Sequence, residues 1–234
     1  MTVPPVQTEV NIQLDPLPAE TADIASAAIE AIPTQYYDGK AKTPELTVTL
    51  DGTKLVEGTD YEVAYANNTD PGTATVTLTG KGSYAGTKTA TFAIEQPVKV
   101  YRLYNKWSGE HLFTTSSDEY DSLAKLGWQQ EGVAWQSPTT STMPVYRLYN
   151  PWSGDHHYTA SKKEYDELHA LGWNQEGVIF YSADAETGAP IYRLFNKWLT
   201  QGTHLFTTDE SEYENLGKLG WQQEDIAFYG LKLQ

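Results

Sequence analysis

The feature that most constrains the fold is a phrase of aromatic, polar and histidine residues that occurs three times. It reads YRLYNKWSGEHLFTT from Tyr101, YRLYNPWSGDHHYTA from Tyr146 and YRLFNKWLTQGTHLFTT from Tyr192. The copies recur about every 45 residues, a period typical of repeat architectures. Because a unit of that size buries little apolar surface alone, we expect the three to close into one domain.

Each repeat predicts the same order of elements. A strand of the VYRLYN type leads into a loop with tryptophan, and a second strand opens at histidine. A helix follows, because Ser or Asp precedes a run with tyrosine and leucine at helical spacing, and a glycine ends it. Tyr120, Leu123 and Leu126 are expected to share one face of the first helix. The phrases WQQEGVAW, WNQEGVIF and WQQEDIAF predict a third strand.

The first part of the chain has a different composition and predicts strands alone. Four segments alternate apolar and polar residues, and turn-forming sequences separate them. Short strands with such turns are typical of a β-sandwich. The segments are Glu45–Leu50, Tyr61–Ala66, Thr73–Gly80 and Thr87–Ile94.

Together these patterns predict a mainly β chain with an immunoglobulin-like β-sandwich and a pseudo-threefold repeat domain. Each repeat should contribute strands and one short helix; a β-trefoil-like closure is the alternative. All seven tryptophans and all five histidines lie after residue 100, which places the boundary near Pro97. The expected parts are a linker at 1–21, a spacer at 22–96, and a domain at 98–234 with repeats at about 100–138, 145–183 and 191–230.

Two resemblances carry expectations about location. Residues 36–94, with GTDYEVAYANN and GKGSYAGT, resemble the immunoglobulin-like repeats of Gram-positive cell-surface proteins. The phrases YRLYN, GEHLFTT and GWQQEG resemble a module of secreted bacterial proteins that has no assigned activity and is common near glycan-degrading domains. The resemblances imply a secreted or cell-surface fragment, attached through another part of a longer protein.

The charge and the missing cysteines exclude several classes of function. The formal net charge of −15 disfavours nucleic acid as a partner. No apolar run approaches the length that a membrane helix needs. Without cysteine the chain has neither disulfides nor thiolate sites. Because the carboxylates recur symmetrically instead of forming one unique pair, we expect no enzyme and no cofactor or metal; a glycan hydrolase is the least favoured class.

The candidate ligand-binding residues lie in the three tryptophan loops. A tryptophan in a short polar loop can form a platform for a sugar ring, or fold back as a lid. The acidic residue and histidine that follow can bind hydroxyl groups, or they can serve the turn itself. The candidates are Trp107, Glu110, His111, Trp152, Asp155, His156, Trp198 and His204.

Other repeated residues favour structural roles. Each repeat has one arginine directly after the tyrosine of its first strand and one glutamate at its third strand: Arg102 and Glu131, Arg147 and Glu176, and Arg193 and Glu224. This fixed spacing predicts an ion pair within each repeat; contact with a ligand is the alternative. Trp128, Trp173 and Trp221 directly follow the helix-ending glycine, where tryptophan most often packs. The third repeat departs from the pattern: its loop is longer and Thr203 replaces the acidic residue.

The function expected from these features is non-catalytic, lectin-like binding of a cell-wall or host glycan by a module with a spacer. Such a module would hold an attached enzyme or adhesin at its target, and three weak sites would add avidity. The alternative is a protein-binding or purely structural surface module. Exposure of the loop tryptophans separates the two.

Overall fold

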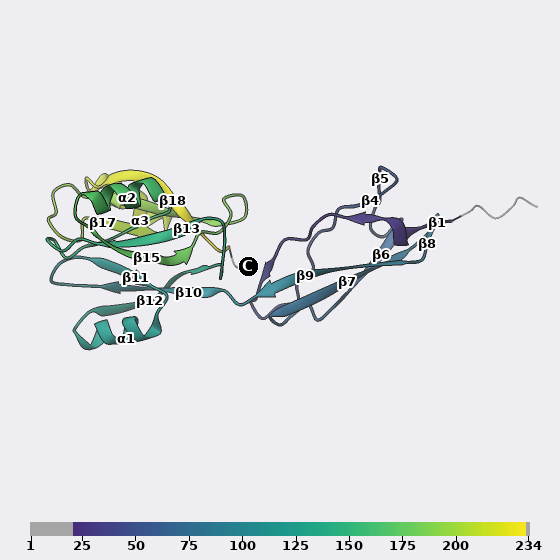
Figure 1. The fold of residues 1–234 in the computed structure, drawn as a ribbon, viewed down its shortest axis with the longest axis horizontal. Coiled ribbons are helices and arrows are strands. Elements are labelled where there is room, and N and C mark those ends of the chain that lie inside the picture. Colours follow the sequence, from purple (N-terminus) through teal and green to yellow (C-terminus); the bar gives the residue numbers. More distant parts are fainter. Residues whose placement is uncertain (1–20, 233–234) are drawn as a thin grey trace, which may run out of the picture. The chain divides into compact units, whose positions relative to one another are not determined.

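The structure is a computed structural model that describes residues 21–232. The predicted linker at 1–21 lies outside the described residues, apart from Thr21. The described chain is mainly β, as predicted, and carries three α-helices (Figure 1). It divides into two compact units, one formed by 21–32, 43–66 and 75–91 and the other by 33–42, 67–74 and 92–232. All three repeats lie in the second unit.

The first part of the chain forms the predicted sandwich of two sheets. One sheet has the strand order β2-β4-β5 and the other the order β3-β9-β7-β6, beside a small β1-β8 pair. Both sheets contribute to one buried core cluster, which includes Val48, Val76 and Leu78. The elements are β1 (Ala22–Asp23), the short 3-10 helix η1 (Ile24–Ser26), β2 (Ala28–Ile29), β3 (Gln35–Tyr36), β4 (Val48–Leu50), β5 (Thr53–Lys54), β6 (Tyr61–Ala66), β7 (Gly72–Gly80), β8 (Tyr84–Ala85) and β9 (Thr87–Glu95).

Each repeat folds into one three-stranded antiparallel sheet and one helix. The first strand of each repeat lies in the centre, with the second and third strands on either side. The three sheets are separate, which matches the predicted strand-and-helix unit better than a plain trefoil. The elements are β10 (Val98–Tyr104), β11 (His111–Thr114), α1 (Ser117–Lys125) and β12 (Gln129–Ser137); β13 (Pro144–Tyr149), β14 (His156–Thr159), α2 (Lys162–Ala170) and β15 (Asn174–Tyr181); β16 (Ala189–Phe195), β17 (His204–Thr207), α3 (Glu210–Lys218) and β18 (Gln222–Gly230).

The helices begin and end where the sequence predicts. Each starts after a side chain that accepts a backbone N–H of the first turn, namely Ser116, Ser161 or Asp209. Each is stopped by a glycine in the left-handed region that directly follows the C-terminal cap residue, with φ of 97° at Gly127 and 96° at Gly220. This fixed stop sets the direction in which the chain turns into the third strand.

One prediction about the helices is wrong. Leu126 was expected on the packed face with Tyr120 and Leu123, but its side chain is exposed, as are those of Leu171 and Leu219. The helix proper ends at Lys125, so Leu126 is the C-terminal cap residue and no longer follows the helical face. The stacked pair Tyr101–Tyr120, with ring centroids 4.6 Å apart, joins the helix to its sheet instead.

The core of the repeat domain shows its pseudo-threefold symmetry directly. Three equivalent positions of each repeat supply one buried cluster of nine side chains. Aromatic rings from different repeats meet edge to face, as in Phe113–Tyr158 and Phe113–Phe206. The nine are Val100, Val145 and Ile191; Phe113, Tyr158 and Phe206; and Trp135, Phe180 and Phe228.

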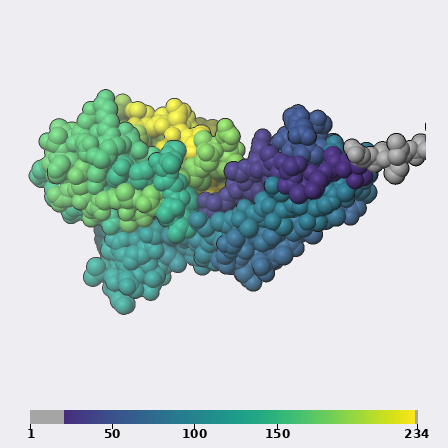
Figure 2. All heavy atoms as spheres, turned by 45° about the vertical axis from the view of Figure 1, so that its right-hand side comes forward, coloured from purple at the N-terminus to yellow at the C-terminus, as the bar shows by residue number. Residues whose placement is uncertain are grey.

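Hydrogen bonds after the third strands close the ring of repeats. The Ser137 hydroxyl donates to the Tyr181 carbonyl, and the Ser182 hydroxyl accepts from the Tyr229 amide. The Leu231 amide donates to the Gln136 carbonyl at 2.8 Å, which joins the third repeat back to the first. In the space-filling view, the yellow atoms of the last repeat lie beside the green atoms of the middle repeat, in keeping with the bond between Tyr229 and Ser182 (Figure 2).

Candidate binding site

The three loop tryptophans are exposed at the tips of turns. Each turn is stabilised by the asparagine two residues before the tryptophan. The Asn105 side-chain oxygen accepts the Trp107 amide at 3.0 Å, and Asn150 and Asn196 do the same for Trp152 and Trp198. In this turn the asparagine side chain takes up the hydrogen bond of the tryptophan N–H. The indole ring itself does not pack into the core. The exposed fractions are 67% for Trp107, 71% for Trp152 and 78% for Trp198.

In the first two repeats the tryptophan rests on the helix-ending glycine. A Cβ added to Gly127 would lie 2.6 Å from Cη2 of Trp107, and a Cβ on Gly172 would overlap Cη2 of Trp152. No side chain fits at either glycine while the ring stays in place. We call Trp107 with Gly127 platform 1, and Trp152 with Gly172 platform 2.

The third tryptophan has no such support. A Cβ on Gly220 would meet no atom within 4 Å, although its φ matches that of Gly127. The two extra residues in the third loop displace Trp198 from the glycine, and neighbouring Leu199 is exposed as well. The structure therefore provides two supported platforms and one tryptophan on a longer loop.

The acidic residues of the loops are not placed for a ligand. Glu110 and Asp155 are each only 4% exposed. Glu110 Oε1 accepts the backbone amide of His156 at 2.7 Å and lies 2.7 Å from His156 Nδ1. Asp155 accepts the Gly202 amide at 2.6 Å and the Thr203 hydroxyl at 3.2 Å. Each carboxylate joins its own repeat to the next one instead of facing a ligand.

The three histidines are half-buried beside the glutamates of their own third strands. The Nε2 atoms of His111, His156 and His204 lie 3.7, 3.8 and 3.9 Å from these carboxylates. Burial, with the Arg102 charge, lowers the pKa of His111 to about 4. Burial, with the neighbouring His157 and Arg193, lowers the pKa of His204 to about 3. These two imidazoles are neutral near pH 7, which suits packing between repeats.

The predicted arginine–glutamate pairs form, and each arginine also reaches the neighbouring repeat. Within the repeats, Arg102 Nε and Arg147 Nε lie 2.7 and 2.6 Å from Glu131 and Glu176. Arg193 Nε lies 2.9 Å from Glu224, without the alignment of a hydrogen bond. The arginines thus stabilise the fold of their own repeats.

Between repeats, the same arginines bind a glutamate on the preceding helix. Arg147 holds Glu119 of α1 through two hydrogen bonds of 2.9 and 3.0 Å, and Arg193 Nη1 lies 3.1 Å from both oxygens of Glu164. The third contact is looser, with Arg102 Nη1 3.6 Å from Glu212. Sequence reasoning missed these glutamates, although each directly precedes the helix tyrosine of its repeat.

A histidine that the sequence reasoning passed over lies at the junction of the second and third repeats. His157 is buried where the other repeats have Leu112 and Leu205. Its Nε2 lies 3.2 Å from Glu164 and 3.3 Å from Arg193, and its buried Nδ1 has no partner among residues 21–232. Burial raises the pKa of Glu164, but hydrogen bonds with His157 and Thr159 outweigh it and lower that pKa to about 2.

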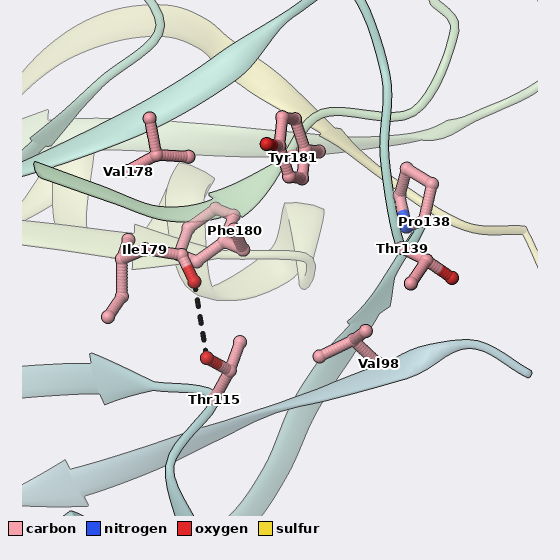
Figure 3. Close-up of a pocket in the computed structure, with 8 residues that line it drawn as sticks. All are labelled: Val98, Thr115, Pro138, Thr139, Val178, Ile179, Phe180 and Tyr181. Carbon is pink, nitrogen blue, oxygen red and sulfur yellow. Dashed lines mark hydrogen bonds between the residues drawn. The ribbon is translucent and has the colours of Figure 1, made fainter.

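A pocket in the repeat domain lies away from the predicted residues. It joins the first and second repeats, where the Thr115 hydroxyl donates to the Ile179 carbonyl at 3.2 Å (Figure 3). Its volume of about 240 Å³ is below the roughly 300–1,000 Å³ of small-molecule sites. The lining residues are Val98, Thr115, Pro138, Thr139, Val178, Ile179, Phe180 and Tyr181. None of them is a candidate ligand residue.

The described residues show no feature typical of a metal site or a membrane helix. Between residues 21 and 232, no three His, Asp or Glu side chains are grouped to hold a metal ion. Among the helices described, none has the length and apolar character needed to cross a membrane.

Comparison with known proteins gives one match. The model of a family described as "Domain of unknown function (DUF5648)" matches residues 99–231, which coincide with the three repeats. Searches of curated proteins and of solved structures found no match.

Proposed function

Since the chain belongs to the DUF5648 family, whose description assigns no activity, we propose a function from the geometry: the repeat domain is a non-catalytic carbohydrate-binding module. The observation that carries this proposal is the exposure of Trp107 and Trp152, each supported by a glycine. An exposed indole held in a fixed position offers a flat apolar face to the C–H groups of a sugar ring.

The surroundings of platforms 1 and 2 favour a shallow site. Leu126 and Leu171 directly precede the two glycines and are exposed, so each platform has an aliphatic neighbour in the chain. Exposed large apolar side chains that recur at equivalent positions mark an interaction surface better than scattered ones do. Two platforms on one domain add avidity for a repetitive glycan if both engage at once.

The proposal includes an extracellular location and a spacer role for the sandwich. It is supported by the resemblance of residues 36–94 to immunoglobulin-like repeats of Gram-positive surface proteins. Non-catalytic binding is supported by the use of the repeated arginines and glutamates between repeats. These groups stabilise the ring of repeats instead of flanking one cleft.

A purely structural or protein-binding module is the second candidate. It is favoured by Glu110 and Asp155, which the loops use to join repeats. On this view the loops exist to close the fold. That view gives no physical role to the outward tryptophans, whose exposure costs solvation free energy.

The test is a glycan array and a cell-wall pull-down with the full chain and two variants. The double substitution Trp107→Ala with Trp152→Ala removes both platforms, and Trp107→Phe with Trp152→Phe keeps an aromatic face. Binding that is lost in the alanine variant and partly kept in the phenylalanine variant, with unchanged circular dichroism, supports the proposal. Absence of binding to host glycans and to purified cell wall would move the assignment to the second candidate.

A further inference from the structure

Lysines distinguish the tryptophan loops from one another. Lys106 Nζ lies 4.8 Å from the ring centroid of Trp107, and Lys197 Nζ lies 4.9 Å from that of Trp198. Both distances are within the range of a cation–π contact. The middle loop has Pro151 at the equivalent position.

The first and third repeats also share a second lysine, at the end of the helix, that the second repeat lacks. Lys125 and Lys218 occupy the last turns of α1 and α3, two residues before the glycine. The equivalent residue of α2 is Ala170. The first and third repeats therefore each carry two lysines around the tryptophan loop and helix end, and the second repeat carries none there.

These lysines are mostly free of counter-charges, although the chain is strongly acidic. Among residues 21–232, Lys106, Lys125 and Lys197 form no ion pair, whereas Lys218 pairs with Glu214 at 4.0 Å. On α2, by contrast, Lys162 and Lys163 are paired with acidic residues one turn away. Lys106 and Lys197 are thus unpaired cations beside exposed indoles in a chain of net charge −15.

Burial of the tryptophan rings does not account for these lysines. The cation–π contact leaves Trp107 and Trp198 more than half exposed, so neither lysine serves to bury its ring. An indole next to an ammonium group fits a sugar that presents a C–H face and a carboxylate on its edge. The lysine supplies charge-assisted hydrogen bonds to that carboxylate.

We propose that the tryptophan loops of the first and third repeats bind an acidic glycan whose sugars carry carboxylates, and that platform 2 binds without regard to charge. This inference rests on the proposed function, because it names the ligand class of the same loops. It commits to a carboxylate as the recognised anion. A phosphate-bearing polymer is a different occupant, and the test separates it.

The experiment measures binding of the full chain to matched ligands by calorimetry. The probes are trigalacturonic acid, its methyl ester, and polyglycerol phosphate. The acid and its ester share one sugar scaffold, so their affinity ratio reports the charge alone. The expected result is binding of the acid about fivefold or more tighter than binding of the ester, weakening with salt.

Substitutions assign the preference to the lysines. Lys106→Gln with Lys197→Gln should weaken binding of the acid and bring the acid-over-ester affinity ratio toward one. The matched control is Lys99→Gln with Lys163→Gln, which removes two charges from exposed positions of the same domain and should keep the preference. Pro151→Lys should add a preference for acid to platform 2.

The outcomes separate this inference from the proposed function. Equal binding of acid and ester, lost in Trp107→Ala with Trp152→Ala, would overturn the inference and leave the proposed function standing. Tighter binding of polyglycerol phosphate than of trigalacturonic acid would overturn the carboxylate assignment. Absence of binding to all three probes overturns the inference, and the glycan array then decides the proposed function independently.

Discussion

Trp107 lies over Gly127 so closely that a Cβ at the glycine would be 2.6 Å from the indole Cη2. This contact joins the loop after the first strand to the end of the helix in the same repeat. The glycine thus ends the helix and also forms the support for the ring. The pair Trp152 and Gly172 repeats the relationship, whereas Trp198 and Gly220 do not.

Substitution of Gly127 by alanine tests that contact against a control within the same chain. Gly127→Ala and Gly220→Ala introduce the same strain, because φ is 97° and 96°, at roughly 1–2 kcal/mol. Only Gly127→Ala also displaces an indole. We expect it to lower the free energy of unfolding more than Gly220→Ala, and to change the tryptophan fluorescence, measured in urea titrations. Equal effects of the two substitutions would show that the platform is not fixed by the glycine.

Removal of the Glu110 charge tests whether this residue joins repeats. Glu110→Gln weakens the contacts to His156, and we expect a loss of about 1–3 kcal/mol in the free energy of unfolding. Glu186→Gln, at an exposed position, is the control and should change little. A Glu110→Gln protein with unchanged stability and lost glycan binding would return Glu110 to the ligand site.

The arginine–glutamate contacts between repeats predict that the junction of the third and first repeats is the weakest. Glu119 forms two short hydrogen bonds with Arg147, whereas Glu212 lies 3.6 Å from Arg102. Glu119→Gln is expected to cost roughly 1–2 kcal/mol, and Glu212→Gln less than about 1 kcal/mol. Thermal unfolding of the two variants gives the comparison. A larger loss in Glu212→Gln would mean that the third and first repeats are joined more tightly than the distances indicate.

We expect the repeat domain to lose stability as the pH falls below about 6.5, before the carboxylates begin to titrate. The pKa values of His111 and His204 fall from 6.5 in the unfolded chain to about 4 and about 3 in the folded chain. Above pH 6.5 both states are neutral, so their contribution is constant. As the pH falls below 6.5 the unfolded chain binds protons first, and each histidine lowers the free energy of unfolding by up to about 1.4 kcal/mol per pH unit.

Urea titrations between pH 7.5 and pH 4 measure this loss. His111→Gln is the matched variant, and its stability should fall less between pH 6.5 and pH 4 than that of the parent chain. A parent stability that stays constant down to pH 4.5 would contradict the burial of neutral imidazoles.

The sequence predicted what depends on local pattern. The strand Tyr61–Ala66 and the helix caps at Ser116, Ser161 and Asp209 were predicted correctly, since alternation and capping are read within a few residues. The arginine–glutamate pairs were predicted because both partners recur in one register within the repeat.

What depends on the neighbouring repeat was not predictable in the same way. The sequence pattern of a repeated residue is the same whether the residue contacts its own repeat or the next one. For this reason Glu110 was predicted to bind a ligand, whereas in the structure it binds His156 of the next repeat. Leu126 was misplaced because the helical pattern continues for one residue beyond the helix. The buried His157 was passed over because its leucine counterparts give no hint of a polar junction.

The most direct test of the central claim is ¹⁹F NMR of the full chain with 5-fluorotryptophan, titrated with the glycan that the array identifies. Single Trp→Phe variants assign the seven resonances. The account predicts that the resonances of Trp107 and Trp152 shift on binding, while those of the half-buried Trp128 and Trp173 stay in place. Shifts confined to Trp128 and Trp173, or binding with no shift of either platform, would contradict the assignment of the loops as the binding site.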